Sequence, residues 1–289
     1  MVPIPFPLAI SSSLYGRDAL PDALPRLAEL GFRAVELVAD VPQLFPAHWS
    51  VGQVARLAEQ IEALELHVTG LSAETGRGFF SPIPAGAIYE PALVSPQAAP
   101  RRLRLQHLQR CLDFAFALGA PCVVLNSGPC LPGIAPPQAW EALLEGLTVL
   151  LSYAEELGIL LAIAPRPGHV ISRVSDFRIL ANEQPHPLLG LHLDLAQLVL
   201  DDVGELAIGM AAGRIWSVAV TDAKRPHPYR LRPGHGDVGL ASLLEALRRV
   251  EFRGPLTLHL ENEQEFPEHA AAEAVQTVTE LVANMAIAS

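Results

Sequence analysis

The segment "GILLAIAPRPGHV" (residues 158–170) has the pattern of a buried strand in a parallel sheet. Gly158 closes the amphipathic run before it, and a nearly continuous apolar run follows from Ile159 to Ala164. Pro165 then stops the run, since proline cannot donate a backbone hydrogen bond to a neighbouring strand. A short and wholly apolar strand is typical of a sheet that helices cover on both faces.

The same alternation of apolar and amphipathic runs continues from one end of the chain to the other. Strict alternation predicts a parallel sheet, and eight such units in 289 residues favour a closed (β/α)8 TIM barrel. We therefore expect a single domain over residues 1–289. The first apolar run is not followed by a glycine-rich phosphate-binding motif, which argues against a dinucleotide-binding fold. The predicted strands span residues 7–13, 32–38, 66–72, 120–128, 159–165, 188–195, 214–223 and 254–261.

The charge balance argues against two classes of partner. The chain has 20 Lys and Arg against 31 Asp and Glu, a formal charge of −11, and no basic run. Binding to nucleic acid or to anionic lipid is therefore not expected. The three cysteines form no disulfide framework, and no apolar stretch has the length of a membrane span. The N-terminal segment does not have the pattern of a signal peptide, so a cytoplasmic location is expected.

One connection is unusually long. Residues 79–100, "FFSPIPAGAIYEPALVSPQAAP", join the third predicted strand to the third helix and are rich in proline. Loops of this length are uncommon unless they serve a function. We expect this loop to lie over the carboxyl-terminal mouth of the barrel as a lid; the alternative is an ordinary surface loop.

Two side chains at the ends of predicted strands are the strongest catalytic candidates. Asp194 interrupts the apolar run "LGLHLDLAQ", and a carboxylate there needs a compensating partner. His259 shares one strand face with Thr257 and Glu261 by the alternation of side chains along a strand. If that face points into the barrel, His259 meets Asp194 as an acid/base pair. The alternatives are an Asp that caps a loop and a His held in the core.

Further polar side chains follow other predicted strands, where TIM barrels place their substrate contacts. Arg166 lies two residues beyond Ala164 and is expected to bind an anionic or oxyanionic group of the substrate. The remaining candidates for substrate binding are Glu36, Asn126, Asp222, Arg225 and His235.

Several phrases in order along nearly the whole chain resemble the xylose isomerase-like TIM barrels, also called the sugar phosphate isomerase/epimerase superfamily. They include "LAELGFRAVEL", "RRLRLQHLQRCLDFAFALGAPCVVLNSG", "YAEELGILLAIAPRPGHV", "LGLHLDLAQ", "RIWSVAVTDAKR" and "RPGHGDVGLASLLEALRRVEFRGPLTLHLE". The resemblance implies a small polyhydroxylated or keto substrate and proton transfer next to its carbonyl. It also implies that Arg225 matches an arginine that contacts substrate, that Asp222 matches an acid near it, and that Gly234 and Gly236 match a Gly-x-Gly loop.

Members of this family typically hold a divalent metal with a Glu, an Asp, a His and a Glu at the ends of strands five to eight. Carried over to this sequence, the four positions are Ala164, Asp194, Ala219 and His259. Three of the four ligand types are therefore replaced, and the usual metal chemistry is not expected. The alternative is a rebuilt site that holds Zn2+ or Mn2+ through Asp194, His259 and Glu261, with help from His235.

Three hypotheses follow for the function. The first is a sugar isomerase or epimerase, or a lyase, that works without a metal through His259 and Asp194. The second is a metal-dependent isomerase or epimerase with the rebuilt site. The third is a non-catalytic subunit that binds a sugar-like ligand or supports a partner. Apolar helices on the outer ring are compatible with a homodimer or a heteromeric partner.

Overall fold

The computed structural model describes residues 6–201, 203–225, 227 and 229–287. Two positions that bear on the sequence predictions lie outside the described residues. They are residues 1–5 of the N-terminal segment and Asp202 between the sixth and seventh strands. Within the described chain, no helix is both long and apolar enough to cross a membrane.

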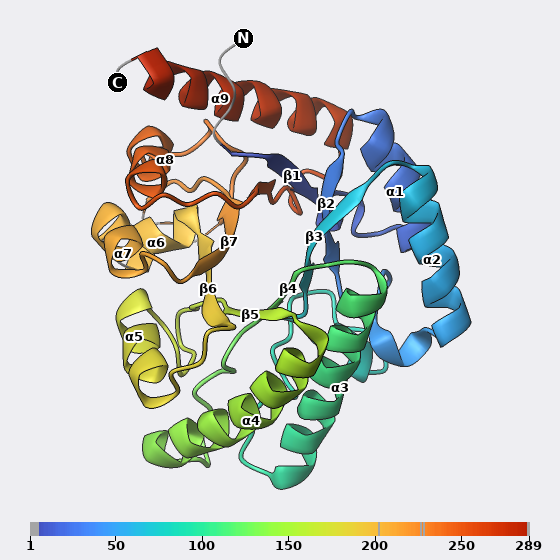
Figure 1. Ribbon diagram of the computed structural model, residues 1–289, viewed down its shortest axis with the longest axis vertical. Helices are drawn as coiled ribbons and strands as arrows, with labels where there is room; N and C mark the ends of the chain where they lie inside the picture. The colour runs from blue at the N-terminus through green and yellow to red at the C-terminus, as the bar shows by residue number, and fades with distance from the viewer. Residues whose placement is uncertain (1–5, 202, 226, 228, 288–289) are drawn as a thin grey trace.

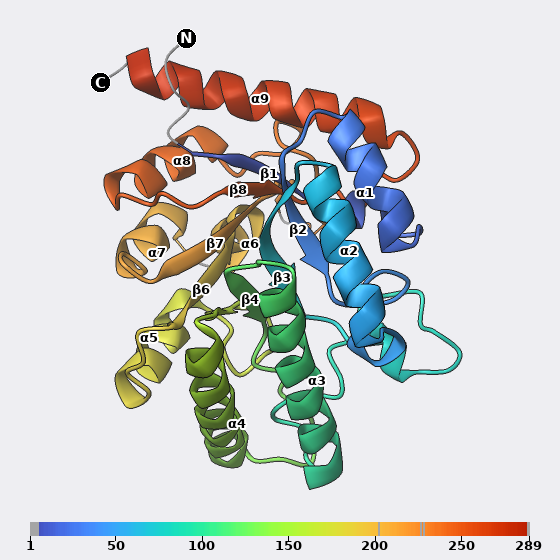
Figure 2. The ribbon, with the colours of Figure 1, turned by 45° about the vertical axis from the view of Figure 1, so that its right-hand side comes forward.

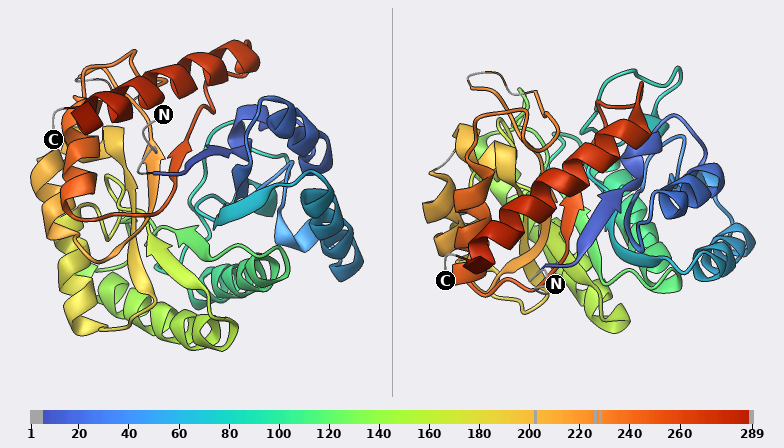
Figure 3. Two further views of the ribbon diagram at one scale, coloured as in Figure 1. Left: turned by 45° about the horizontal axis from the view of Figure 1, so that its top comes forward. Right: turned by 90° about the horizontal axis from the view of Figure 1, so that it is seen from above.

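Eight parallel strands form a closed barrel in the order in which they occur along the chain, and β8 pairs with β1 to complete it. This confirms the predicted (β/α)8 architecture as a single domain. The helices form a ring outside the strands (Figure 1), and the view with the top turned forward shows the strands at the centre of this ring (Figure 3, left). The strands are β1 (Leu8–Ser11), β2 (Ala34–Val38), β3 (His67–Ser72), β4 (Cys122–Leu125), β5 (Leu160–Ile163), β6 (Leu189–Asp194), β7 (Ile215–Val220) and β8 (Leu256–Leu258).

The strands are shorter than the apolar runs that predict them. Residues 12–13, 126–128 and 259–261 continue these runs but leave the hydrogen-bond ladder and enter the loops at the mouth. His259 and Glu261 thus lie just beyond β8 instead of inside it, which corrects the predicted end of that strand. Of the polar side chains at these positions, Ser13, His259 and Glu261 line the cavity at the mouth.

The helices follow the strands as expected, with one additional helix directly after β6. Neighbouring helices pack side by side on the outside, as α3 and α4 do in the turned view (Figure 2). Local signals set several helix ends: Ser50 and Gln53 form a reciprocal capping box at the start of α2, and Gly158, with φ of 69°, ends α4. The helices are α1 (Leu20–Glu29), α2 (Val51–Ala63), α3 (Ala98–Ala117), α4 (Pro136–Leu157), α5 (Val174–Glu183), α6 (Leu195–Asp201), α7 (Gly204–Met210), α8 (Leu240–Arg249) and α9 (Pro267–Ile287), with short 3-10 helices η1 (Ser12–Tyr15), η2 (Pro46–His48) and η3 (Arg77–Phe79).

The hydrophobic core lies between the barrel and the helix ring. Most of the buried Leu, Ile, Val and Phe side chains of both layers belong to one contiguous cluster, and Cys122, Val124, Ala162 and Ala164 form a second, smaller one. This packing leaves the polar side chains concentrated at the carboxyl ends of the strands, where the loops begin.

Candidate functional site

A cavity of about 900 Å³ lies at the carboxyl ends of the strands, and we call it the mouth cavity. Residues 83–87 and Tyr89 of the long β3–α3 connection line it, next to residues that follow β1, β3, β5 and β8. The lid role of this connection stays a prediction, whereas its place beside the cavity is observed. Besides Tyr89, the charged or titratable side chains of the lining are Arg17, Glu74, Arg77, Arg166, Arg230, His259 and Glu261.

His259 forms a buried pair with Glu36. The imidazole Nε2 lies 2.9 Å from Glu36 Oε1, and both side chains are almost completely buried. Burial alone would lower the pKa of His259, but the Glu36 carboxylate outweighs it and raises that pKa above its ordinary value. Burial alone would raise the pKa of Glu36, but the imidazolium of His259 outweighs it and lowers that pKa below its ordinary value. His259 lines the mouth cavity and Glu36 is not among the lining residues, so the carboxylate supports the histidine from behind.

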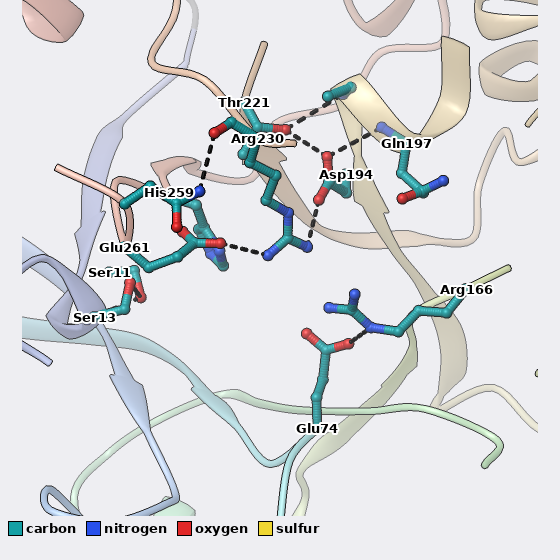
Figure 4. Close-up of polar contacts among 12 residues, drawn as sticks. Ser11, Ser13, Glu74, Arg166, Asp194, Gln197, Thr221, Arg230, His259 and Glu261 are labelled. Atoms are coloured by element: carbon teal, nitrogen blue, oxygen red, sulfur yellow. Dashed lines mark hydrogen bonds and ion pairs between the residues drawn. The ribbon is translucent and has the colours of Figure 1, made fainter. Parts of the chain in front are cut away.

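Asp194 forms an ion pair with Arg230 (Figure 4). Arg230 Nη2 lies 2.5 Å from Asp194 Oδ2, and Nη1 lies 2.7 Å from Glu261 Oε1. The other Asp194 oxygen accepts from the Thr221 hydroxyl and from the backbone N–H of Gln197, 3.2 Å away. Burial raises the pKa of Asp194, but Arg230 and Thr221 hold it well below the usual range. The direct pairing of His259 with Asp194 is therefore wrong: among the described residues, each has a different partner.

Arg166 and Glu74 form a second ion pair at the cavity. Arg166 Nε lies 2.5 Å from Glu74 Oε2, and the guanidinium carbon lies 5.2 Å from the centre of the Tyr89 ring. Burial raises the pKa of Glu74, but Arg166 outweighs it and lowers the pKa to about 2. Asn126 holds this pair in place by donating its side-chain N–H to the backbone carbonyl of Glu74 at 2.7 Å. Arg104 of α3 donates to the same carbonyl at 3.2 Å.

The structure places three of the predicted substrate contacts away from the mouth cavity. Arg225 is exposed, and its Nε lies 3.5 Å from Asp237 Oδ1. His235 is half exposed, and its Nε2 lies 3.6 Å from Glu273 Oε2. Asp222 is buried and accepts from the backbone N–H groups of three loop residues, Ala223, Gly234 and Val238. The structure thus brings together Glu36, Arg166, Asp194, His259 and Glu261, but not these three.

Arg230 is the site residue that the sequence reasoning missed. It lies in a loop that also holds Lys224, Arg225 and Arg232, and nothing in its sequence context separates it from them. Asp194 indicates that such a residue is needed, because a buried carboxylate requires a cation. The loop after β7 could supply it, since β7 is next to β6 in the sheet. Arg166 is predicted as a site residue from the sequence, but its ion pair with Glu74, which follows β3, is not.

A closed parallel barrel with a charged cavity at the carboxyl ends of its strands defines a TIM barrel with its site in the place that TIM-barrel enzymes use. The chain belongs to the xylose isomerase-like TIM barrel family, whose family model matches residues 24–281.

Solved structures with the same fold include several proteins of this group. A xylose isomerase domain protein from Planctomyces limnophilus is 20% identical, with a TM-score of 0.75 and coverage of 96% of this chain and 98% of the other. A D-tagatose 3-epimerase-like protein is 16% identical, with a TM-score of 0.79 and coverage of 96% and 97%. The IOLI protein, solved with a binding zinc atom, is 17% identical, with a TM-score of 0.77 and coverage of 96% and 98%. No curated protein matches the sequence.

The donor set at the mouth does not fit the divalent metal that the family implies. Ala164 and Ala219 offer no ligand atoms, and the Asp194 carboxylate is already engaged by the guanidinium of Arg230. Within the described part of the chain, no group of three or more His, Cys, Asp or Glu side chains is arranged to hold a metal ion. We therefore derive no chemical step through a metal.

Proposed function

We propose that the protein is an isomerase- or epimerase-type enzyme that moves a proton next to the carbonyl of a small polyhydroxylated substrate, without a divalent metal. The observation that carries the proposal is the buried His259–Glu36 pair, 2.9 Å apart, with its histidine facing a cavity of about 900 Å³. Membership of the family and the fold shared with a D-tagatose 3-epimerase-like protein support this reaction class.

His259 is the proton-transfer group in this proposal. A histidine takes up and releases a proton near neutral pH, and a carboxylate behind it orients the ring and stabilises the imidazolium. Glu36 occupies that position here. His259 removes the proton from the carbon next to the carbonyl. Its return to the former carbonyl carbon, while a hydroxyl proton moves between the two oxygens, isomerises the substrate, and re-protonation of the first carbon on its opposite face epimerises it.

The charge that develops on the carbonyl oxygen needs a positive partner in a site that excludes water. Arg230 lines the same cavity and is close enough to His259 to lower its pKa. Its two carboxylate contacts hold the guanidinium in a fixed place, so the positive charge is oriented before the substrate binds. Arg230 thus supplies the electrostatic stabilisation that a metal supplies in other members of the family.

Proton exchange tests this function directly. The protein is incubated in D2O with D-fructose, D-tagatose and L-ribulose, and deuterium incorporation is followed by NMR. We expect His259→Gln to lower the exchange rate by about 100-fold or more while the circular dichroism spectrum is kept. His269→Gln is the matched control, because His269 is 67% exposed and lies on α9.

Two results would overturn the proposal. One is exchange by His259→Gln at the wild-type rate. The other is exchange that a chelator abolishes and that stoichiometric Zn2+ or Mn2+ restores, which would support the rebuilt metal site with Asp194, His259 and Glu261 instead. If no substrate of the three exchanges but one binds tightly, the non-catalytic subunit is the better description.

A further inference from the structure

The lining of the mouth cavity is less acidic than the chain as a whole. The protein carries a formal charge of −11, yet the cavity lining contains four arginines and only two glutamates. Asp194 and Glu36 lie close to these groups but are not among the lining residues. A ligand that enters the cavity therefore meets arginine side chains, two of which are partnered by carboxylates.

Two of these arginines face one another. In the close-up, Arg230 extends downward and Arg166 extends from the right, and their guanidinium ends point toward the same region (Figure 4). Arg166 is near enough to Arg230 for that cation to lower its pKa, against the carboxylate contacts that raise it. Glu74, Asp194 and Glu261 already compensate the two positive charges. The two arginines therefore offer an incoming anion their remaining N–H donors rather than an uncompensated charge.

Each guanidinium is anchored on one edge and free on another. Arg166 contacts Glu74 through Nε, and its two Nη groups have no hydrogen-bond partner within the described residues. Arg230 uses one N–H of Nη2 for Asp194 and one N–H of Nη1 for Glu261. The other N–H donors of this guanidinium have no partner among the described residues. The Nη edge of a guanidinium matches the two oxygens of a carboxylate.

We propose that Arg166 and Arg230 together form a carboxylate-binding site, and that the substrate is a 2-oxo sugar acid whose carboxylate lies between them. This rests on the proposed function for the position of the proton that moves. With the carboxylate between the arginines, the adjacent carbonyl oxygen remains beside Arg230. The next carbon then carries the proton that His259 removes.

A carboxylate fits this gap better than a phosphate. Glu74, Asp194 and Glu261 all contact the two guanidinium groups and carry three negative charges among them. A phosphate dianion would be repelled by these carboxylates about twice as strongly as a monoanion at the same distance. Arg17 and Arg77 also line the cavity and attract the ligand, since neither forms an ion pair within the described residues.

Three hexuloses that differ only at C1 provide the test by isothermal titration calorimetry. They are 2-oxo-D-gluconate with a carboxylate, D-fructose with a hydroxymethyl group and D-fructose 1-phosphate. We expect the wild-type protein to bind 2-oxo-D-gluconate about tenfold or more tightly than either of the others, as a charge-assisted contact to two arginines implies.

A paired substitution locates the site without leaving a buried charge alone. Glu74→Gln/Arg166→Gln removes both members of one ion pair, and we expect it to abolish the preference for the carboxylate. Glu205→Gln/Arg249→Gln is the matched control, because this pair, 2.7 Å apart, is exposed on α7 and α8. The control is expected to bind all three ligands as the wild type does.

The outcomes separate this inference from the proposed function. Equal binding of the three ligands, tightest binding of D-fructose 1-phosphate, or an unchanged preference in Glu74→Gln/Arg166→Gln would each overturn the carboxylate site. If 2-oxo-D-gluconate binds through the arginines but takes up no deuterium in D2O, the site stands and the proton transfer by His259 fails. If D-fructose exchanges and binds as tightly as the acid, the proton transfer stands and the carboxylate site fails.

Discussion

Buried carboxylates at the mouth of the barrel are each matched by a cation that comes from a different loop. Glu36 contacts His259, Glu74 contacts Arg166, and Asp194 contacts Arg230. A lone buried charge costs several kcal/mol, and removal of one partner of a buried pair is strongly destabilising for this reason. The pairs therefore tie β2 to the segment after β8, the end of β6 to the loop after β7, and the loop after β3 to the loop after β5.

The Glu74–Arg166 pair makes the free energy of unfolding depend on pH in the acidic range. The pKa of Glu74 is about 2 in the folded chain and near 4.5 in an unfolded one. A lowered folded pKa contributes stability above the unfolded value, and this stability is lost as the pH falls through the folded value. We expect this carboxyl to contribute on the order of 3 kcal/mol at neutral pH, lost between about pH 5 and pH 2.

Urea unfolding at pH 7, 4 and 3 measures this effect. The free energy of unfolding of Glu74→Gln/Arg166→Gln is expected to fall less steeply with acid than that of the wild type. The surface pair variant Glu205→Gln/Arg249→Gln should follow the wild-type curve, since exposed ion pairs contribute at most about 1 kcal/mol. Parallel curves for the wild type and Glu74→Gln/Arg166→Gln would show that Glu74 has an ordinary pKa.

The loop between β7 and α8 shows how one element is held by a single side chain. Asp222 accepts three backbone N–H groups of this loop, and Gly236 packs directly on it. A Cβ at Gly236 would lie 2.1 Å from Asp222 Oδ1 and 2.3 Å from the carbonyl oxygen of Ala223. Gly236 is therefore explained by close packing and Gly234 by its φ of 90°, and the same loop carries Arg230 to the cavity.

Gly236→Ala tests this account of the loop. The backbone must shift to relieve the clash, and we expect the free energy of unfolding to fall by about 2 kcal/mol or more. Gly209→Ala is the control, because Gly209 lies within α7 and no neighbouring atom lies within 4 Å of the place that a Cβ would occupy there. At that position, alanine should stabilise by up to about 1 kcal/mol. Equal stability of the two variants in urea would contradict the packing role of Gly236.

At the scale of the whole molecule, barrel closure joins both ends of the chain. β1 and β8 are neighbours in the sheet although they are separated by almost the whole sequence. One contiguous core then connects the strands with the helix ring. The barrel cannot lose one strand pair without opening, so we expect it to unfold as one unit.

Leu71→Ala in β3 tests this unity by calorimetry. The side chain is fully buried, and truncation of such a leucine costs about 2–5 kcal/mol. We expect a single thermal transition that moves to lower temperature without splitting. Leu103→Ala, on the exposed face of α3, should leave the transition nearly unchanged, because Leu103 is 45% exposed. Two separate transitions in Leu71→Ala would argue against one cooperative domain.

The barrel could be predicted because its determinants are local and repeated. Each strand and helix has its own periodicity, turns and caps, so eight successive units indicate the fold even when strand ends are several residues off. The errors lie where polar residues such as His259 and Glu261 continue an apolar run, since alternation alone does not mark where the hydrogen-bond ladder stops.

The sequence by itself determined the barrel, the acidic surface and the presence of Asp194, His259 and Arg166 near strand ends. Only the tertiary structure decided which acidic side chain pairs with which basic one. Arg230 is 36 residues from Asp194 and Arg166 is 92 residues from Glu74, and the folded loops bring each pair to 2.5 Å. Ion pairing depends on distance and burial rather than on order along the chain. Several arginines in one loop are therefore equivalent in sequence until packing selects one of them.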